Sequence, residues 1–333
     1  MSAYVVVGAG AIGGTVGAQM LRAGHDVLFC DADAEHVAAI NERGLAIDGP
    51  VEQFTVEARA VAPDDLPDEL GAVLLAVKAQ HTAAALEAVL PRLASDGFVV
   101  SLQNGLNEDA IAARVGAGRT VGAFVNLFAD VVGPGVIRDG GLGALVVGEM
   151  DGSTSARVQS VVQDLQSWGP ARATTNVSGY LWSKLGFGAM LTATALADAP
   201  MADLIDAHRP MMYRLTAEVF AVAKARGIAL EPFDAFDPAP YAGEDVGAKD
   251  RATDRLVAWL RTQSKDRSGI WRDLAVRHRP TEVPTHYGAV LDAAASAGVD
   301  IPLVRDLLRQ IGELEAGAAM SQDRLDALGT VTA

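Results

Sequence analysis

One lysine interrupts an otherwise apolar segment in the second half of the chain. Between residues 177 and 197, Lys184 is the only acidic or basic side chain apart from the phenol of Tyr180. At 3.6 residues per turn it shares a helical face with Gly188 and Thr192, and the opposite face is equally apolar. A helix that is apolar on all sides is normally buried, and burial lowers the pKa of an amine. Lys184 could therefore act as a general acid near neutral pH, with room for a small molecule beside Gly188 and Thr192. The alternative is a lysine that extends to the surface at a helix end.

A second ionisable candidate, Glu282, stands in the segment Arg279-Pro280-Thr281-Glu282-Val283-Pro284. Thr281 can cap a helix that starts here, and a glutamate in the first turn stabilises such a helix through its dipole. From spacing alone, this structural role is better supported than a catalytic one.

A glycine-rich turn near the N-terminus has the spacing of a dinucleotide-binding motif. It follows a strand of valines, opens a helix and reads Gly8-Ala9-Gly10-Ala11-Ile12-Gly13. In such a motif Gly8 permits the tight turn, Gly10 lets a pyrophosphate approach the backbone, and Gly13 lets helix and strand pack closely. The helix N-terminus then directs its free N–H groups at the phosphates. The alternative is a tight strand–helix turn without a ligand.

The residue after the second predicted strand indicates which dinucleotide would bind. Asp31 stands there, and its carboxylate can accept hydrogen bonds from an adenosine ribose but would repel a 2′-phosphate. No lysine or arginine occurs between Asp26 and Arg43 to bind that phosphate. The pattern favours NAD over NADP, although Asp31 could instead serve as the N-cap of the following helix.

Two polar residues follow later predicted strands. Lys78 comes after an apolar run that ends at Val77, and Asn104 follows the run that ends at Leu102. In an open α/β sheet the ligand lies outside the carboxyl ends of the strands, so both side chains could contact a cofactor or an anionic substrate. The alternatives are a solvated lysine at a strand end and a turn residue before glycine.

These residues lie in two regions that differ in composition and in the secondary structure they predict. Over residues 1–174, short runs of apolar residues alternate with helical stretches such as 34–43 and 108–115, which predicts an α/β domain with a Rossmann-type parallel sheet. Over residues 175–333, long segments rich in alanine, leucine and methionine predict an all-helical domain, including helices over 178–197 and 202–226. The acidic, proline-containing stretch 231–250 is most simply a surface loop.

The composition excludes several classes of protein. Of 333 residues, 27 are basic and 42 acidic, and the formal net charge of −15 disfavours nonspecific binding to nucleic acid or a membrane surface. The single cysteine, Cys30, cannot form an intrachain disulfide, which fits a reducing cytoplasm. No apolar run approaches the roughly 20 residues that span a bilayer. We expect a soluble, cytoplasmic protein with a small-molecule substrate and no metal.

Taken together, the motifs of this chain resemble those of the ketopantoate reductase (2-dehydropantoate 2-reductase) family. They keep the family's order and span nearly the whole chain. They are Gly8-Ala9-Gly10-Ala11-Ile12-Gly13-Gly14, Val77-Lys78, Gln103-Asn104-Gly105, Gly133-Pro134-Gly135, Leu181-Trp182-Ser183-Lys184-Leu185 and Arg279-Pro280-Thr281-Glu282. The last two are the most specific, because ordinary dinucleotide-binding enzymes lack them.

The resemblance implies roles for individual residues. Lys184 would protonate the carbonyl oxygen as hydride arrives, and Glu282 would hydrogen-bond groups near the nicotinamide and the substrate. Lys78 and Asn104 would contact cofactor and substrate, and the backbone around Ala129 would border the nicotinamide. The resemblance also implies an active site in the cleft between the two domains and a homodimer formed through the helical domain.

Three departures from the family pattern bear on substrate and cofactor. Family reductases usually carry asparagines four and eight residues after the lysine, where this chain has Gly188 and Thr192. A serine pair usually precedes the glutamate; here the sequence is Ser268-Gly269, and we expect Ser268 in the substrate site. Many members have an arginine for NADP where this chain has Asp31.

These observations predict an NAD-linked oxidoreductase that interconverts a small 2-oxo acid and its 2-hydroxy acid. Ketopantoate, or a similarly branched and hydroxylated acid, is the leading substrate. A rival is a catabolic dehydrogenase of a sugar acid or another 2-hydroxy acid. Further alternatives are a dinucleotide sensor without catalysis and an opine- or imine-forming dehydrogenase that needs an amine co-substrate.

Overall fold

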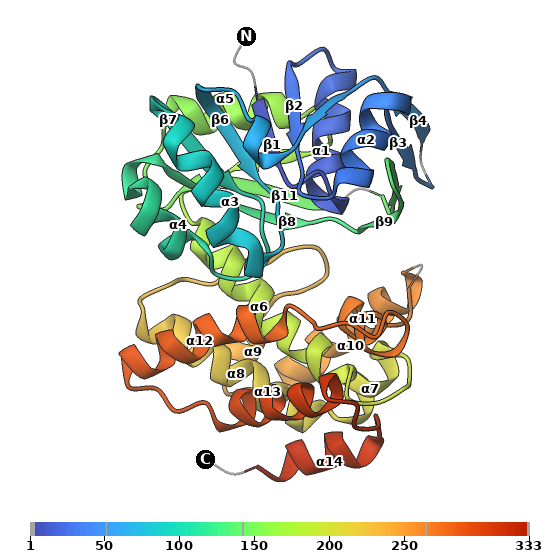
Figure 1. Cartoon of the computed structure of the whole chain (residues 1–333). Coiled ribbons are helices and arrows are strands. Elements are labelled where there is room, and N and C mark those ends of the chain that lie inside the picture. Colours follow the sequence, from blue (N-terminus) through green and yellow to red (C-terminus); the bar gives the residue numbers. More distant parts are fainter. Residues whose placement is uncertain (1–3, 51, 142, 264, 332–333) are drawn as a thin grey trace. The chain divides into compact units, whose positions relative to one another are not determined.

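The chain folds into two compact units, residues Met1–Val177 and Ser178–Ala333. A computed structural model describes residues 4–50, 52–141, 143–263 and 265–331 (Figure 1). The first unit combines strands and helices, and the second is helical, as predicted from the change in amino-acid composition along the sequence.

The first unit contains a large sheet of mainly parallel strands. Its described strands are β1 (Tyr4–Val7), β2 (Val27–Cys30), β3 (Leu45–Asp48), β4 (Gln53–Val56), β5 (Arg59–Val61), β6 (Leu70–Leu75), β7 (Leu93–Ser101), β8 (Thr120–Asn126), β9 (Ala129–Gly133), β10 (Val136–Asp139), β11 (Ala144–Glu149) and β12 (Ala171–Ala173). Eight of them form one sheet in the order β12-β11-β8-β7-β6-β1-β2-β5. Only β8 and β11 pair antiparallel in this sheet.

Helices cover both faces of this sheet. They are α1 (Ala11–Arg22), α2 (Ala34–Arg43), α3 (Thr82–Val89), α4 (Glu108–Val115) and α5 (Ala156–Leu165). Along β1, Tyr4 and Val6 join the core formed with α1 and α5, whereas Val5 and Val7 join the core formed with α3 and α4. A strand buried on both faces must be apolar at every position, which explains its unbroken apolar run.

A second, four-stranded sheet in the order β4-β3-β10-β9 accompanies the first. Sequence patterning did not reveal it, because its strands are only four or five residues long and β4 and β9 have no fully buried residue. Strands β9, β10 and β3 pack against α1, so this sheet covers the helix that the glycine-rich turn opens.

The second unit is built around α8 (Arg209–Ala225), which contacts α7, α9, α10, α12, α13 and α14. Its described helices also include α6 (Val177–Thr194), α7 (Met201–Ala207), α9 (Pro238–Ala242), α10 (Val246–Thr262), α11 (Gly269–Ala275), α12 (Val283–Ala297), α13 (Pro302–Glu315) and α14 (Gln322–Thr330). The single helix expected over 202–226 is two helices that meet at His208, because Pro210 has no N–H to donate to the carbonyl of Asp206 and its ring would clash with that carbonyl in a continuous helix.

The prediction of a surface loop over residues 231–250 was wrong. The segment contains α9 and the start of α10, and it buries Phe233, Phe236 and Tyr241. Phe236 stacks on Tyr241 with ring centroids 5.3 Å apart. These aromatic side chains anchor the segment in the core despite its acidic and proline-rich composition.

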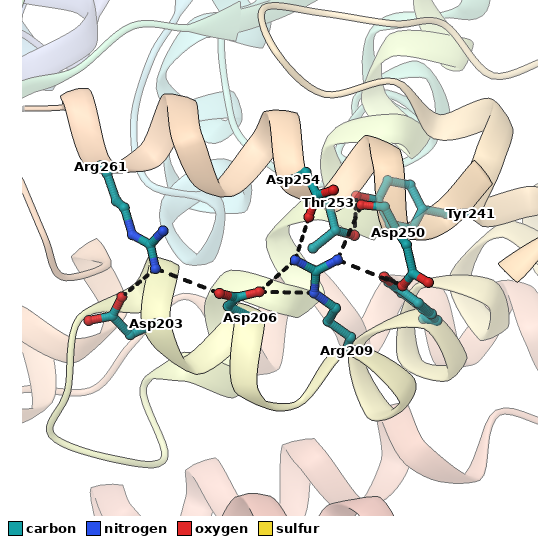
Figure 2. A network of polar contacts seen from close by, with 9 residues as sticks. Asp203, Asp206, Arg209, Tyr241, Asp250, Thr253, Asp254 and Arg261 are labelled. Atoms are coloured by element: carbon teal, nitrogen blue, oxygen red, sulfur yellow. Dashed lines mark hydrogen bonds and ion pairs between the residues drawn. The ribbon is translucent and has the colours of Figure 1, made fainter. Parts of the chain in front are cut away.

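A network of charges joins α7, α8 and α10 (Figure 2). The Arg209 guanidinium lies 2.6 Å from Asp206 and 2.6 Å from Asp254. Arg261 lies 2.9 Å from Asp203 and 3.6 Å from Asp206, which links the two arginines through one carboxylate. The surrounding carboxylates raise the pKa of Arg209, so it stays charged at every accessible pH.

Within the described part of the chain, every helix is too short or too polar to cross a lipid bilayer.

Candidate active site

The predicted cofactor residues follow the carboxyl ends of neighbouring parallel strands. Asp31 follows β2, Gly8 follows β1, Lys78 lies beyond β6 and Asn104 beyond β7. Register pairs Val7 with Cys30 and with Leu75, and Leu75 with Ser101, so these four strands end at one edge. Ala129 follows β8, the next parallel strand, as the first residue of β9. The tertiary structure thus gathers these residues at the edge where open α/β sheets bind ligands.

Each glycine of the turn meets the structural requirement predicted for it. Gly8 has φ +98°, a conformation that L side chains rarely adopt. A Cβ at Gly13 would clash with the carbonyl oxygen of Gly8 and press on the side chains of Val6 and Ala76. A Cβ at Gly10 would meet no atom of the chain within 4 Å. The first and third glycines therefore serve the fold, and the second leaves open space.

That open space lies at the N-terminus of α1, which fits a dinucleotide phosphate. Gly10 is the N-cap and offers no side-chain hydrogen bond, and the first turn of α1 carries no acidic residue. The first N–H groups of a helix lack intrahelical partners and attract anions. A Gly-Ala-Gly backbone can approach phosphate oxygens without steric hindrance, so the residues of this turn fit the pyrophosphate of a nicotinamide dinucleotide.

Asp31 supports the turn from the adjacent strand. Its Oδ2 accepts a hydrogen bond from the backbone N–H of Ala9 at 2.8 Å, and its Oδ1 accepts one from Asp33 at 3.0 Å. Each carboxylate oxygen has a second lone pair, so hydroxyl groups of a ribose can still be accepted. The alternative role of Asp31 as a helix cap is wrong, because Asp33 caps α2 by accepting from the N–H groups of Glu35 and His36.

Lys78 and Asn104 lie on two turns that a glutamine ties together. The Gln103 amide donates to the carbonyl of Val77 and to the hydroxyl of Thr82, each at 2.8 Å. Lys78 is partly exposed and Asn104 is exposed, so both side chains can reach a ligand.

A buried carboxyl group that the sequence did not reveal supports the turn of Asn104. Glu108 is 3% exposed, and its Oε2 accepts from the backbone N–H of Asn107 at 3.1 Å. The Asn107 amide in turn donates to the carbonyl of Asn104 at 2.8 Å. Burial raises the pKa of Glu108 to about 7, even though this N–H and the nearby Ser101 hydroxyl favour the charged form. Within the described chain, Oε1 of Glu108 has no hydrogen-bond partner of good geometry.

Lys184 lies inside α6, in an apolar environment that perturbs its amine. The helix buries Trp182 and Leu185 on either side of it, as predicted for a helix apolar all round. The residue as a whole is partly accessible, yet enough protein surrounds the amine to lower its pKa to about 8. Desolvation is the main cause, and the carboxylates of Asp234 and Glu282 partly oppose it. An amine with such a pKa can donate a proton near neutral pH.

Asp234 belongs to the segment that was expected to be a surface loop. Its backbone has φ +46°, an uncommon conformation for a residue other than glycine. The segment is held on α6 on both sides of Lys184. The backbone N–H of Glu231 donates to Ser183 Oγ at 3.1 Å, and the ring of Phe233 packs 6.1 Å from that of Phe187.

Glu282 lies directly before α12, and its side chain does not cap the helix. It occupies the N-cap position without capping through its side chain, while Thr281 Oγ1 accepts from the N–H of Val283 at 3.3 Å. The Glu282 carboxylate lies 3.8 Å from His286 Nε2, and it also acts on the charge of Lys184. Helix capping thus falls to Thr281, and the Glu282 carboxylate faces ionisable groups.

The expected room beside Gly188 and Thr192 is smaller than predicted. A Cβ at Gly188 would lie 3.1 Å from the hydroxyl of Tyr287, which donates to the carbonyl of Leu185 at 2.8 Å. The Thr192 hydroxyl donates to the carbonyl of Gly188 at 2.8 Å. Tyr287 is 3% exposed, and burial raises its pKa. This side chain therefore fills the position next to Gly188.

Ser268 has a structural contact of its own. Its side chain caps α11 by accepting from the N–H of Trp271 at 3.2 Å. Its hydroxyl hydrogen can still be donated, so its place in a substrate site stays a prediction.

Sequence reasoning missed Glu108, Asp234, His286 and Tyr287. The spacing of His286, one helical turn after Glu282, could have indicated a contact between them. No local pattern marks the others, because each contacts an element distant in sequence or is buried by one.

Family models match both halves of the chain. "Ketopantoate reductase PanE/ApbA" matches residues 4–152, and "Ketopantoate reductase PanE/ApbA C terminal" matches residues 176–315. The 2-dehydropantoate 2-reductase of Halobacterium salinarum is 30% identical over 91% of this chain and 95% of its own length. That of Pyrococcus abyssi is 26% identical over 90% of this chain and 93% of its own.

Solved structures have the same fold. A PanE/ApbA family ketopantoate reductase from Ralstonia eutropha has a TM-score of 0.79 and 26% identity, covering 94% of this chain and 98% of its own. D-Mandelate dehydrogenase with NADH and anilino(oxo)acetate has a TM-score of 0.80 and 22% identity, covering 97% and 99%. With two family models and a full-length relative at 30% identity, the chain belongs to the ketopantoate reductase family.

Proposed function

We propose that this protein is an NAD-linked oxidoreductase that interconverts a small 2-oxo acid and its 2-hydroxy acid, with Lys184 as the proton donor. The observation that carries the proposal is the amine of Lys184 in an apolar helix, with a pKa of about 8 and two carboxylates acting on it. Membership of a reductase family supports the reaction class.

The Lys184 ammonium suits the charge that such a reaction develops. A nicotinamide cofactor, when bound, would supply the hydride, and hydride addition to the carbonyl carbon would place negative charge on the carbonyl oxygen. A preorganised ammonium stabilises that charge and then gives its proton to the oxygen. Glu282 and Asp234 favour the protonated amine, so the proton donor stays loaded near neutral pH. In the oxidative direction, the neutral amine of Lys184 accepts the hydroxyl proton.

Two observations support NAD as the preferred cofactor. Asp31 presents a carboxylate at the end of β2, where a 2′-phosphate would be repelled. D-Mandelate dehydrogenase, which shares the fold, was solved with NADH. We infer that NADH binds more tightly than NADPH.

The surroundings of Gly188 favour a substrate with an apolar branch. The hydroxyl groups of Tyr287 and Thr192 both donate to backbone carbonyls of α6, and neither position carries an amide. Beside Gly188, these two hydroxyl groups have no further hydrogen to donate, so a substrate hydroxyl placed there would lose a hydrogen bond that it made with water. We therefore expect a branched apolar 2-oxo acid to be reduced more efficiently than ketopantoate or an oxidised sugar acid.

Ketopantoate remains the second candidate, because the full-length relatives at 26–30% identity are 2-dehydropantoate 2-reductases. Steady-state assays of the purified protein should compare ketopantoate, apolar 2-oxo acids and oxidised sugar acids, each with NADH and NADPH. We expect the highest kcat/KM for an apolar acid with NADH. A preference for ketopantoate would reject the argument from Tyr287, and no turnover of any 2-oxo acid would reject the function.

A further inference from the structure

His36 is a buried histidine in the first turn of α2 that the proposed reaction does not use. It is 4% exposed, and its ring joins two segments that are far apart in sequence. Its Nε2 lies 2.9 Å from the carbonyl oxygen of Ala9, in the glycine-rich turn. Its Nδ1 lies 3.0 Å from the backbone nitrogen of Gly135, between β9 and β10.

These two contacts define the protonation state of the ring. The backbone N–H of Gly135 can only donate, so Nδ1 must carry a lone pair. The carbonyl of Ala9 can only accept, so Nε2 must carry a hydrogen. Only the neutral imidazole protonated on Nε2 satisfies both partners. A second proton on Nδ1 would face the Gly135 N–H and break that contact.

The peptide groups on both sides of Ala9 are therefore fixed by side chains. Asp31 accepts from the Ala9 N–H at 2.8 Å, and His36 donates to the Ala9 carbonyl. Ala9 is fully buried and lies between Gly8 and Gly10, two residues with few conformational restraints of their own. Unrestrained glycines would sample many backbone conformations, and only some of them direct N–H groups at a phosphate.

The contact with Gly135 anchors the ring from the other side. Gly135 has φ +71°, and its carbonyl accepts from the N–H of Ala46 in β3 at 2.9 Å. A Cβ there would lie 3.2 Å from the Cβ of Ala39 in α2, a tight contact, so a side chain at this position would press on the helix in addition to straining the backbone. The Gly133-Pro134-Gly135 motif thereby acquires a physical role as the support for His36.

We propose that His36 is a positioning residue for the dinucleotide: as the neutral Nε2–H tautomer it holds the glycine-rich turn against the β9–β10 hairpin in the conformation that binds the pyrophosphate. The proposal rests on the proposed function for the identity of the ligand. The tautomer itself is a property of the protein without cofactor.

The first test is the nitrogen spectrum of the histidine rings. Protein labelled with ¹⁵N in its imidazole rings, without cofactor at pH 7.5, should show His36 as the Nε2–H tautomer with Nδ1 accepting a hydrogen bond. Assignment uses His36→Phe, from which that signal is absent. An Nδ1–H tautomer, or a signal averaged like that of a solvated imidazole, would overturn the proposal independently of any activity.

The second test measures cofactor affinity in variants. His36→Phe replaces the imidazole with a somewhat larger ring that has no nitrogen, and it should raise the Kd for NADH about tenfold while kcat at saturating NADH changes less than threefold. His36→Gln offers one donor and one acceptor and should recover part of the affinity; it also replaces the phenylalanine variant if that one does not fold. The matched control is His25→Phe, because His25 lies in the same unit, is about a quarter exposed and pairs with Asp164. Wild-type affinity in a folded His36 variant would overturn the positioning role.

Discussion

Two regions of the molecule are built by different means. One is the edge of the first unit where β1, β2, β6 and β7 end, called the cofactor edge because we propose that NADH binds there. The other is the surroundings of Lys184 in the second unit. At the cofactor edge, the groups that fit the ligand are backbone N–H groups and glycines at strand ends, held by buried side chains such as Asp31 and His36. Around Lys184, the groups that define the environment are side chains from α6, α12 and the segment that carries Asp234.

This difference explains why binding of a dinucleotide is easier to infer from the sequence than the choice of substrate. A turn made from backbone requires glycines at fixed spacing, so it leaves a motif that can be found in the sequence. A site made from side chains can be changed by single substitutions at positions far apart in the sequence. Tyr287 fills the position beside Gly188 without altering any motif, so the reaction class is easier to infer than the substrate.

The largest expected effect comes from removing the amine of Lys184. Lys184→Ala should reduce turnover by about 10²- to 10⁴-fold, because a positioned proton donor is lost, and should leave the Kd for NADH within twofold. Lys224→Ala removes an exposed lysine from the same unit and should leave both constants unchanged. Steady-state kinetics and NADH titration give the two readouts. Turnover within a few-fold of wild type would contradict the acid role and favour a different proton donor.

A substitution of Glu108 tests whether this buried carboxyl group lowers the free energy of unfolding when it is charged. Its folded pKa of about 7 lies above the value in an unfolded chain, so its contribution to stability is complete at pH 4 and is lost as pH rises through 7. Glu108→Gln should therefore gain stability relative to wild type with rising pH, on the order of 2 kcal/mol at pH 8. Urea unfolding at pH 5 and pH 8 measures the difference, and Asp68→Asn, at an exposed carboxylate elsewhere in the same unit, should show none. An equal effect at both pH values would refute the assignment.

The glycine-rich turn offers a substitution that separates binding from folding. Gly10→Ala adds a methyl group where the chain has open space, so Tm should be unchanged while the Kd for NADH rises at least about tenfold, or 1.4 kcal/mol. Gly71→Ala makes the same change in open space at the start of β6 and should affect neither quantity. Gly13→Ala, which clashes with Gly8, should lower Tm instead. Unchanged NADH binding in Gly10→Ala would argue against a phosphate at this turn.

The pH dependence of the reaction reports on the amine of Lys184 directly. Reduction needs the ammonium, so kcat/KM should fall about tenfold per pH unit above a pKa of about 8. Oxidation needs the neutral amine, so its rate should rise through the same pH and then level off. Mirror-image profiles are the expected result, and a profile for reduction that stays flat from pH 7 to 9 would exclude Lys184 as the titrating group.

The smallest expected effect concerns the scaffold of the second unit. Arg209→Met should cost about 1 kcal/mol of stability, because Asp206 and Asp254 lose their shared partner, and high salt should reduce the cost. Arg305→Met breaks an exposed pair with Asp300 and should cost nothing measurable. Thermal unfolding at low and high salt compares the two, and equal losses would mean that the network in Figure 2 adds nothing beyond a single surface pair.

Much of the fold was predictable because it depends on local patterns. The helices Ala34–Arg43 and Glu108–Val115 have the bounds that the sequence predicted. The second sheet was not predictable, since its short strands gain their hydrogen bonds only from partners far along the chain, such as β3 with β10. The segment 231–250 misled for a related reason: three buried aromatic side chains outweigh its charge and prolines.

Residue types and spacing were sufficient to indicate the glycine-rich turn, the acidic residue after β2 and the isolated lysine, because each depends on neighbours along the chain. The partners of those residues depend on folding. Asp234 near Lys184, Tyr287 against Gly188, and His36 between Ala9 and Gly135 are contacts across 27 to 99 residues of sequence. Hydrogen bonds and charge interactions act over a few ångströms, so which distant side chains take part is settled only when the chain has packed.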